Sequence, residues 1–427
     1  MAHQKALKLT AFLMASTLSS MSYGAGFAII EQSVTGLGRA FSGSAAVAED
    51  ASTLFFNPAG LTNLSHAELD SGFHFIDVES EFKDNGSTSL LGPLTGGDGG
   101  NGVNGLVPNL YYAHPLNDRT VVGIGINAPF GLVTDYNNTW KGRYHAVKSD
   151  LKTVNINPSI AYKATDKLSV GLGVSLQKID LKLTQMAAIV ASQSFDAKAK
   201  LEAEDWSWGY NLGLIYQATE ATRLGLSYRS KISHTLTGDG KLHDLAGITL
   251  APNGIITSEK IRGDVDLPES ISLAIHHQIG DKWAVMADAS WTRWSRFQEL
   301  AISSSFPGLL TSTKEEKWEN SMRYGLGLTY DYSNKWSFRA GIAYDETPVK
   351  NAQFRTARVP GNDRKWVALG ASYKYSDHIT IDAGYTHIFI SDTKINETLD
   401  PPFNHNLNGE YEADVDIFGL QMRWMFL

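Results

Sequence analysis

The feature that most constrains the fold is a two-residue alternation of apolar with small or polar side chains, which recurs from residue 67 to the C-terminus. Successive side chains of a β-strand point to opposite faces, so each such segment predicts a strand with one apolar face. Aromatic residues tend to mark the ends of each apolar face and aliphatic residues its middle. A lipid-facing band between two aromatic girdles has this layout, which favours a transmembrane β-barrel. The clearest apolar faces are Trp208, Tyr210, Leu212, Leu214 and Tyr216; Leu168, Val170, Leu172, Val174 and Leu176; Tyr324, Leu326, Leu328 and Tyr330; Trp336, Phe338, Ala340, Ile342 and Tyr344; and Phe418, Leu420, Met422, Trp424 and Phe426 at the C-terminus.

The connections form a second pattern, in which short polar turns alternate with long links. Outer-membrane barrels have short turns on the periplasmic side and long loops outside. Six short and seven long connections predict an all-β barrel of 14 antiparallel strands. A soluble β-sandwich would alternate too, but it does not readily explain girdles, a signal peptide and one-sided loops together. The short turns are Asn117-Asp118, Thr165-Asp166, Thr219-Glu220, Gly280-Asp281, Ser333-Asn334 and Ser376-Asp377, and the long links lie near residues 85–105, 131–147, 186–201, 238–258, 302–312, 348–364 and 394–410.

The N-terminus predicts a signal peptide. Lys5 and Lys8 precede a mostly apolar stretch from Leu9 to Met21, and small residues follow it. A basic start, an apolar stretch and small residues are what a signal peptidase requires. We therefore expect residues 1–24 to be removed after Gly24.

Residues 25–66 show no alternation, unlike the predicted barrel of residues 67–427. A compact non-strand segment ahead of many strands predicts a hatch inside the barrel lumen. Its charges need a partner or water, so Arg39 is expected to pair with Glu49 or Asp50. The alternative is that these three residues lie on a solvated periplasmic face.

The same segment carries a resemblance to a known family. Gly26-Phe27, the run from Gly36 to Gly43 and the tripeptide Asn57-Pro58-Ala59 resemble the N-terminal hatch of the FadL family, outer-membrane channels for long-chain fatty acids and other hydrophobic compounds. The resemblance extends over essentially the whole mature chain. It implies a bacterial outer-membrane location, contact with membrane lipid and lipopolysaccharide, and a monomer. The aromatic C-terminal strand resembles the segment by which the barrel-assembly machinery recognises its substrates.

Composition and motifs exclude several other functions. Cysteine is absent, so the chain has no disulfide, thiolate nucleophile or Cys-ligated metal. A net charge of -8 gives no basic footprint for nucleic acid. No catalytic motif stands out, and the rings of His276 and His277 would point to opposite faces of a strand. We expect no enzyme activity, cofactor or metal.

The third predicted strand, Thr120 to Phe130, contains Ala128 and Pro129 and is followed by Gly131. Proline cannot donate to a strand ladder and a nearby glycine often marks a bulge. The sequence therefore predicts an interrupted wall, unless Pro129 merely ends the strand. The resemblance implies an inward kink that opens a lateral hole, lined by Ala128, Gly131 and Gly105.

A ligand site is expected near the long loops. Residues 186–201, with Ile189 and Val190, predict a helix, and the loop from Leu242 to Ile256 exposes Leu245 and Leu250. Exposed apolar residues suggest a surface for an apolar ligand, although the two loops could instead pack together. The resemblance to the FadL family implies that these loops form a shallow groove that first binds the ligand. It also aligns Lys314 and Gln185 with two basic residues that face the ligand carboxylate in a deeper pocket, with Phe27 near it.

These observations predict a passive channel for hydrophobic compounds, with long-chain fatty acids as the leading cargo. About 15 methylenes favour an apolar site over water by on the order of 12 kcal/mol, so a route that never returns the chain to water avoids that cost. The uncharged Gln185 leaves neutral aromatic hydrocarbons as an alternative cargo. A general porin and an outer-membrane lipid hydrolase are further alternatives.

Overall fold

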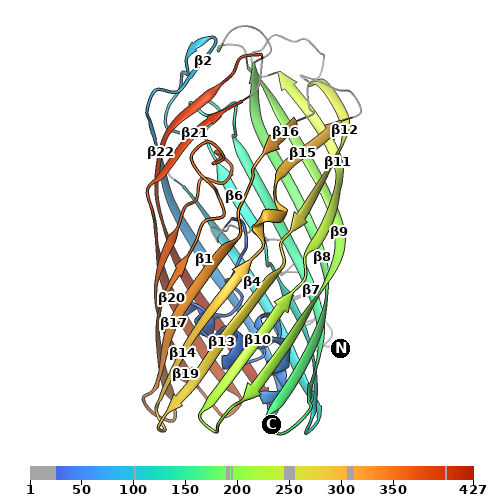
Figure 1. Cartoon of the computed structure of the whole chain (residues 1–427), viewed down its shortest axis with the longest axis vertical. Helices are drawn as coiled ribbons and strands as arrows, with labels where there is room; N and C mark the ends of the chain where they lie inside the picture. Colours follow the sequence, from blue (N-terminus) through green and yellow to red (C-terminus); the bar gives the residue numbers. More distant parts are fainter. Residues whose placement is uncertain are drawn as a thin grey trace, which may run out of the picture.

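Antiparallel strands close into a tall barrel with short turns at one end and long loops at the other (Figure 1). The computed structural model describes residues 26–100, 102–188, 193, 196–244, 255–304, 312–399 and 402–427. The predicted signal peptide, residues 1–24, lies outside the described residues. None of the described helices is both long and apolar enough to cross a membrane.

The wall consists of 14 hydrogen-bonded strands, which confirms the number predicted from the connections. Each predicted short turn joins two neighbouring strands. The last strand pairs with the first from Ala67↔Phe426 to Asp84↔Gly409, and this ladder closes the ring. In order around the ring the strands are β1 (Ala67–Asp84), β4 (Val103–Asn117), β5 (Thr120–Asn127), β7 (Lys148–Lys163), β8 (Leu168–Ala188), β9 (Asp196–Gln217), β10 (Thr222–Arg229), β13 (Ser270–Ile279), β14 (Trp283–Thr292), β17 (Ser321–Asp331), β18 (Trp336–Asp345), β19 (Arg364–Lys374), β20 (Ile379–Ile390) and β22 (Asn406–Phe426).

Additional strands continue the wall toward the long loops. β11 pairs with β9 and β12, β12 pairs with β15, and β15 pairs with β16. β21 pairs with the first part of β22. β2 pairs with β22 and with β3, and β6 pairs with β7, so all of the additional strands are hydrogen-bonded to the ring directly or through one another. They are β2 (Thr88–Ser89), β3 (Gly92–Pro93), β6 (Gly131–Asp135), β11 (Ile232–Asp244), β12 (Ile255–Leu267), β15 (Glu299–Ser304), β16 (Ser312–Glu315) and β21 (Thr393–Thr398).

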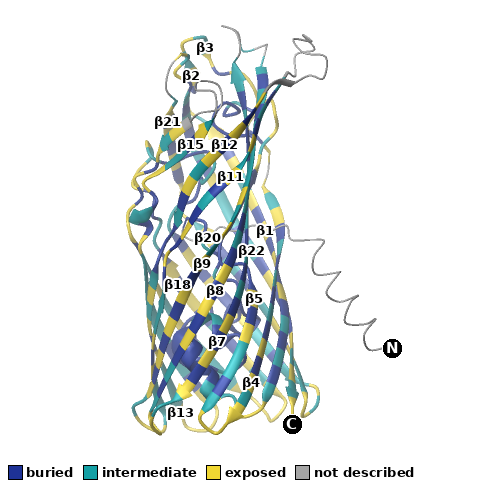
Figure 2. Ribbon diagram, turned by 90° about the vertical axis from the view of Figure 1, so that its right-hand side faces the viewer, coloured by how far each residue is buried: buried dark blue, intermediate teal, exposed yellow. Residues whose placement is uncertain are grey.

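Burial alternates along the strands, because one face meets the lumen and the other faces outward (Figure 2). On β22, Phe418 and Leu420 are 50% and 46% exposed, whereas Gln421 is 1% exposed. An outward apolar band of this kind is stable in contact with lipid chains. The alternation seen in the sequence therefore corresponds to the lipid-facing surface of the barrel.

The helix predicted for residues 186–201 is wrong for residues 186–188 and 196–201, which the structure describes as strands. Met186 lies in β8 and Lys198 in β9, and the two residues are paired across a hairpin. Alanine, lysine and glutamate favour helices in isolation, but here alanine also alternates with charged residues. Ala197 and Ala199 are buried while Lys198 is not. The period of two and the hydrogen bonds of the ladder outweigh helix propensity.

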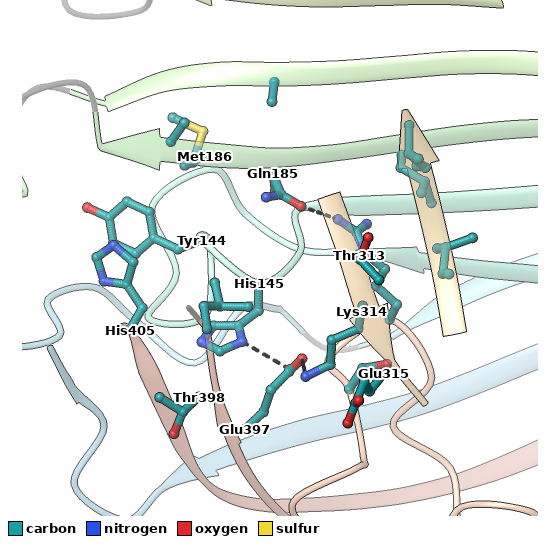
Figure 3. Close-up of a pocket in the computed structure, with 18 of the residues that line it drawn as sticks. Tyr144, His145, Gln185, Met186, Thr313, Lys314, Glu315, Glu397, Thr398 and His405 are labelled. Atoms are coloured by element: carbon teal, nitrogen blue, oxygen red, sulfur yellow. Dashed lines mark hydrogen bonds and ion pairs between the residues drawn. The ribbon is translucent and has the colours of Figure 1, made fainter. Parts of the chain in front are cut away.

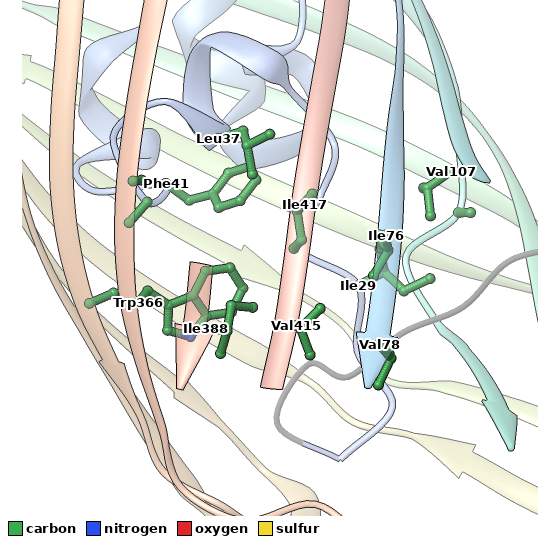
Figure 4. Packing of buried hydrophobic residues seen from close by; sticks show 14 residues of the cluster. Ile29, Leu37, Phe41, Ile76, Val78, Val107, Trp366, Ile388, Val415 and Ile417 are labelled. Carbon is green, nitrogen blue, oxygen red and sulfur yellow. The ribbon is translucent and has the colours of Figure 1, made fainter. Parts of the chain in front are cut away.

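Residues 26–66 lie inside the lower barrel and contain four short helices, blue in Figure 1. Figure 4 shows Leu37 and Phe41 of this hatch packed against the inner wall, where Phe41 and Trp366 of β19 meet edge to face with ring centroids 6.4 Å apart. Burying these apolar side chains fixes the hatch to the barrel. The helices are α2 (Val34–Leu37), α3 (Ser44–Val47), α4 (Thr53–Phe56) and η1 (Pro58–Asn63), and a further 3-10 helix in the wall is η2 (Trp294–Arg296).

Glycines on the inner wall let the hatch approach the backbone of the strands. A Cβ on Gly225 of β10 would lie 1.9 Å from the carbonyl oxygen of Ala45, and one on Gly341 of β18 would lie 2.1 Å from that of Arg39. No side chain fits at such distances. The hatch can therefore take its observed position only because these two wall residues have no side chain.

The tripeptide from Asn57 to Ala59 fastens the hatch to the wall. The Asn57 amide Nδ2 donates to the carbonyl oxygens of Ala45, at 2.6 Å, and of Leu214 in β9, at 3.0 Å. Its Oδ1 accepts from the backbone N–H of Ala59 at 3.1 Å, and Pro58 begins η1, where no N–H is needed. Asn57 thus links two hatch helices to the barrel.

The hatch also carries buried charges. Arg39 forms an ion pair with Glu49, and Arg339 of β18 holds the other carboxylate oxygen of Glu49 at 3.1 Å. Asp50 instead accepts a hydrogen bond from the Thr35 hydroxyl at 2.7 Å. Of the two carboxylates considered for Arg39, the structure pairs it with Glu49, and neither Arg39 nor Asp50 lies on a solvated face.

Candidate functional site

A cavity of ≈ 850 Å³ occupies the long-loop half of the barrel (Figure 3). Its walls come from β8, β9, β15, β16 and β21, and from the connection between β18 and β19, residues 346–363. The lining mixes apolar and charged side chains, which suits a ligand with a polar head and an apolar tail. The apolar lining residues include Leu183, Met186, Leu300, Ile302, Phe354, Leu399 and Phe403.

The connection 346–363 reaches the cavity because it folds inward rather than over the rim. The Arg355 guanidinium donates to the carbonyl oxygens of Gly361, at 3.1 Å, and of Lys394, at 2.6 Å. Val349 is buried in an apolar cluster of the lumen. These contacts hold Thr356 and Arg358 against the cavity.

Lys314 lines this cavity, together with a buried carboxylate. Its Nζ lies 2.8 Å from Oε1 of Glu397 on β21, and Nδ1 of His145 lies 3.0 Å from Oε2 of the same group (Figure 3). Burial alone would raise the pKa of Glu397, but the neighbouring His145 and Lys314 lower it to about 2. Glu397 is therefore ionised and offsets the charge of Lys314.

Gln185 lines the same cavity and lies next to a second cation. The Arg358 guanidinium donates to Gln185 Oε1 at 2.5 Å, to Ser149 Oγ at 3.2 Å and to the carbonyl oxygen of Lys148 at 3.4 Å. Arg358 makes no ion pair with any residue that the structure describes. Burial lowers its pKa to about 10, so it stays charged at neutral pH.

Two more titratable groups define the charge of the cavity. Glu316 is 4% exposed and accepts from the Trp318 indole at 3.2 Å; burial and then the charge of Glu397 raise its pKa to about 8. His405 stacks on Tyr144 with centroids 3.9 Å apart, and burial lowers its pKa to about 4. At neutral pH both are uncharged. The lining then holds two cations, Lys314 and Arg358, and two charged carboxylates, of which Glu397 pairs with Lys314 and Glu315 pairs with Lys317 outside the lining.

Phe27 lies in an aromatic cluster that adjoins this cavity through Trp318, whose indole donates to the lining residue Glu316. Its ring is 4.8 Å from that of Trp294, 5.5 Å from Phe297, 5.6 Å from Trp318 and 6.1 Å from Phe130. Such edge-to-face and tilted contacts stabilise beyond the area that they bury. Phe27 is therefore held in place by four aromatic side chains of the barrel wall and its connections.

The third strand is interrupted where the sequence predicts it. β5 ends at Asn127 and β6 begins at Gly131, and both pair with β7. β4 pairs with β5 only as far as Leu110↔Ile126, so Gly105 and its neighbours are paired with β1 alone. The described strands thus leave a gap in the ladder between β4 and β6.

The N-terminal segment lies against the inner side of this gap. Ile29 N–H donates to the carbonyl oxygen of Pro129 at 2.9 Å, and Gly131 N–H donates to that of Phe27 at 3.0 Å. The Gln32 amide donates to the carbonyl oxygen of Ala128 at 2.8 Å. The backbone groups that the interruption leaves unpaired are thereby satisfied from within.

Four of the expected ligand residues, Ile189, Val190, Leu245 and Leu250, lie outside the described residues. Sequence reasoning missed Arg358, His145, Glu397 and Glu316. They lie on loops or at strand ends, where no period marks a residue as facing inward. The one available signal was the charge density of residues 346–363 in a long link.

The chain is similar to known proteins over almost its whole length. Residues 15–426 match the family described as outer membrane protein transport protein (OMPP1/FadL/TodX). The chain belongs to this family. As a member of the FadL family it is an outer-membrane protein.

Characterised relatives of the FadL family cover almost the whole chain. Outer membrane protein P1 of Haemophilus influenzae is 31% identical over 99% of each chain. The long-chain fatty acid transport protein of Escherichia coli is 30% identical over 89% of this chain and 90% of its own. The crystal structure of a Pseudomonas aeruginosa FadL homologue matches with a TM-score of 0.87 and 25% identity, over 94% of this chain and 100% of that one. The Pseudomonas putida toluene transporter TodX, 19% identical with a TM-score of 0.69, shares the fold.

Proposed function

We propose that the protein is a channel for passive uptake of hydrophobic compounds that carry a carboxylate, with long-chain fatty acids as the cargo. The observation that carries this proposal is Arg358, a half-buried cation whose described hydrogen bonds all go to neutral acceptors. A buried charge without a counter-ion is costly. A ligand carboxylate would supply that counter-ion and accept two parallel hydrogen bonds from the guanidinium.

The rest of the cavity supports the same ligand class. Lys314 is already offset by Glu397, so the carboxylate is expected at Arg358 and Gln185, with Lys314 nearby. The apolar lining removes the alkyl chain from water, at about 0.8 kcal/mol for each methylene. Escherichia coli and Salmonella typhi relatives of similar length are named long-chain fatty acid transport proteins.

The proposed exit is lateral. Displacement of Phe27 from its aromatic cluster would join the cavity to the lumen below, and release of Ile29 from Pro129 would open the gap between β4 and β6. The fatty acid then passes through this gap into the membrane, and its alkyl chain never returns to water. The step is diffusive and uses no cofactor.

The test is an equilibrium binding titration of the purified full-length protein with oleate and with methyl oleate, which lacks the charge. Arg358→Met is expected to weaken oleate binding by about 10- to 100-fold, because a hydrogen bond to a charged group contributes ~1.5–3 kcal/mol. Methyl oleate binding should change little.

Lys350→Met is the matched control, because Lys350 lies on the same connection, is 49% exposed and pairs with Glu319 outside the cavity. Its affinities should equal those of the unmodified protein. Equal loss of oleate and methyl oleate binding in Arg358→Met would contradict the proposal. Uptake of toluene but not of oleate would assign the channel to neutral aromatic hydrocarbons instead.

A further inference from the structure

A second, smaller cavity of ≈ 160 Å³ lies between the N-terminal segment and the hatch helices. Its lining includes the apolar residues Ile29, Ile30, Phe55 and Phe56, and Pro129 at the wall interruption. Small hydroxyl side chains also belong to the lining: Ser227, Ser270, Ser272, Ser290, Thr292 and Ser321. The lining also includes two oppositely charged side chains, Asp345 of β18 and Arg323 of β17, and Pro129 places the cavity beside the gap in the third strand.

Three residues of the lining carry buried donors that no described residue uses. Asn211 Nδ2, Trp294 Nε1 and Arg323 Nε are buried, belong to lining residues and have no hydrogen-bond partner among the described residues. These residues are 2%, 0% and 6% exposed. No buried side-chain acceptor in the described lining is left without a partner. Unsatisfied buried donors are costly, so this set is complementary to a ligand that accepts hydrogen bonds.

Arg229 gives the cavity a cation. Its Nη2 donates to the carbonyl oxygen of Phe55 at 2.7 Å, and its guanidinium carbon lies 4.3 Å from the centroid of the Phe55 ring. Arginine has five N–H donors, and the described residues take one of them and provide no ion-pair partner. The charge is thus held at the cavity by a neutral carbonyl and an aromatic face.

We infer that this cavity is a second carboxylate site, at which Arg229 and the unpaired donors hold the headgroup while the alkyl chain leaves beside Pro129. The inference rests on the proposed function and extends it. A carboxylate that leaves Arg358 without another cation on its route would cross the lumen as an unpaired charge. Arg229 provides that cation next to the exit.

Arg223 offers a matched control, because it also lies on β10. Its Nη1 donates to the hatch carbonyl of Val47 at 2.8 Å, as Arg229 donates to that of Phe55, but Arg223 does not line the cavity. Arg229→Met and Arg223→Met therefore each remove one charged bond to the hatch. Only the first removes a cation from the cavity.

The experiment measures initial uptake of oleate and of oleyl alcohol by bacteria that lack other channels of this family and produce the full-length variants. Arg229→Met should lower the oleate rate about tenfold or more, the effect of losing a charged hydrogen bond. Oleyl alcohol uptake should stay within about twofold on the same grounds, and Arg223→Met should leave both rates unchanged. Arg229→Lys should restore much of the oleate rate. Purified Arg229→Met should bind oleate at the upper cavity as the unmodified protein does.

Two results would overturn the inference. Equal slowing of both cargoes by Arg229→Met would show that Arg229 only anchors the hatch, and unchanged rates for both would show that it has no part in transport. Failure of the unmodified protein to take up oleate would overturn the proposed function itself. These failures are distinguishable, because the last one appears without any substitution.

Discussion

Single charged residues set the expected selectivity, and Glu316 makes it dependent on pH. Its pKa of about 8 means that the carboxyl is neutral at pH 7 and negative above pH 8. The unfolded chain ionises this group near pH 4.5, so the folded state holds an extra proton between these values. Glu316 therefore destabilises the folded protein increasingly as pH rises through that window.

Binding of an anion should weaken across the same transition. A long-chain alkyl sulfonate is a suitable probe, because its own charge does not change. From pH 7 to pH 9 its affinity is expected to fall roughly tenfold, since a like charge about 10 Å away at an effective dielectric constant of about 20 costs ~1.7 kcal/mol. Glu316→Gln should abolish this fall. A pH dependence that survives the substitution would assign the titration to another group.

Only some of the individual residues that line the cavity were predicted from the sequence. Lys314 and Gln185 were placed together by resemblance, and both line one cavity. Arg358 could not be found, because its connection has no periodicity and its inward course depends on contacts such as those of Arg355. The pairing of Lys314 with Glu397 joins residues far apart in the chain, so no local pattern reports it.

Among the elements, the N-terminal segment has the most specific expected role. Ala28 and Phe130 form an antiparallel bridge, flanked by the hydrogen bonds of Ile29 and Gly131. Residues in such a pair have Cα atoms about 4.5 Å apart, which suits a disulfide. The chain has no cysteine of its own. The double variant Ala28→Cys, Phe130→Cys should therefore close without competing thiols.

Oxidation of this pair is expected to stop oleate uptake, and a reductant should restore it, because the bond would fix the segment across the gap. Initial uptake rates under both conditions provide the measurement. Phe130→Cys alone is the control for loss of the Phe130 ring, and Ala28→Cys alone is the control for an added thiol. Undiminished uptake by the oxidised protein would refute exit beside Pro129.

The strands themselves were well predicted, and the one misassigned element has a clear cause. Around residues 186–201 composition favoured a helix, whereas the alternation of Ala197, Lys198 and Ala199 was the better guide. Composition describes an isolated segment. Pairing across a hairpin is a property of two segments together, and only the period in the sequence reports it.

In the whole molecule, the hatch occupies the lumen of a barrel that would otherwise be wide enough to conduct ions. The unmodified protein should show little steady conductance in planar lipid bilayers. Replacing Val34–Asn63 with a flexible linker is expected to open a steady conductance, provided that the heat-modifiable mobility of the barrel is retained. Strong conductance by the unmodified protein would mean that the hatch does not seal the lumen.

The wall glycines that admit the hatch have an evolutionary consequence. Gly225 and Gly341 lie against backbone atoms of the hatch. A substitution at either position therefore also changes how the hatch fits against the wall. The two parts must therefore change together. A chimera that exchanges residues 26–66 between relatives would need these strand positions transferred as well, and divergence in cargo is least constrained in the long connections above them.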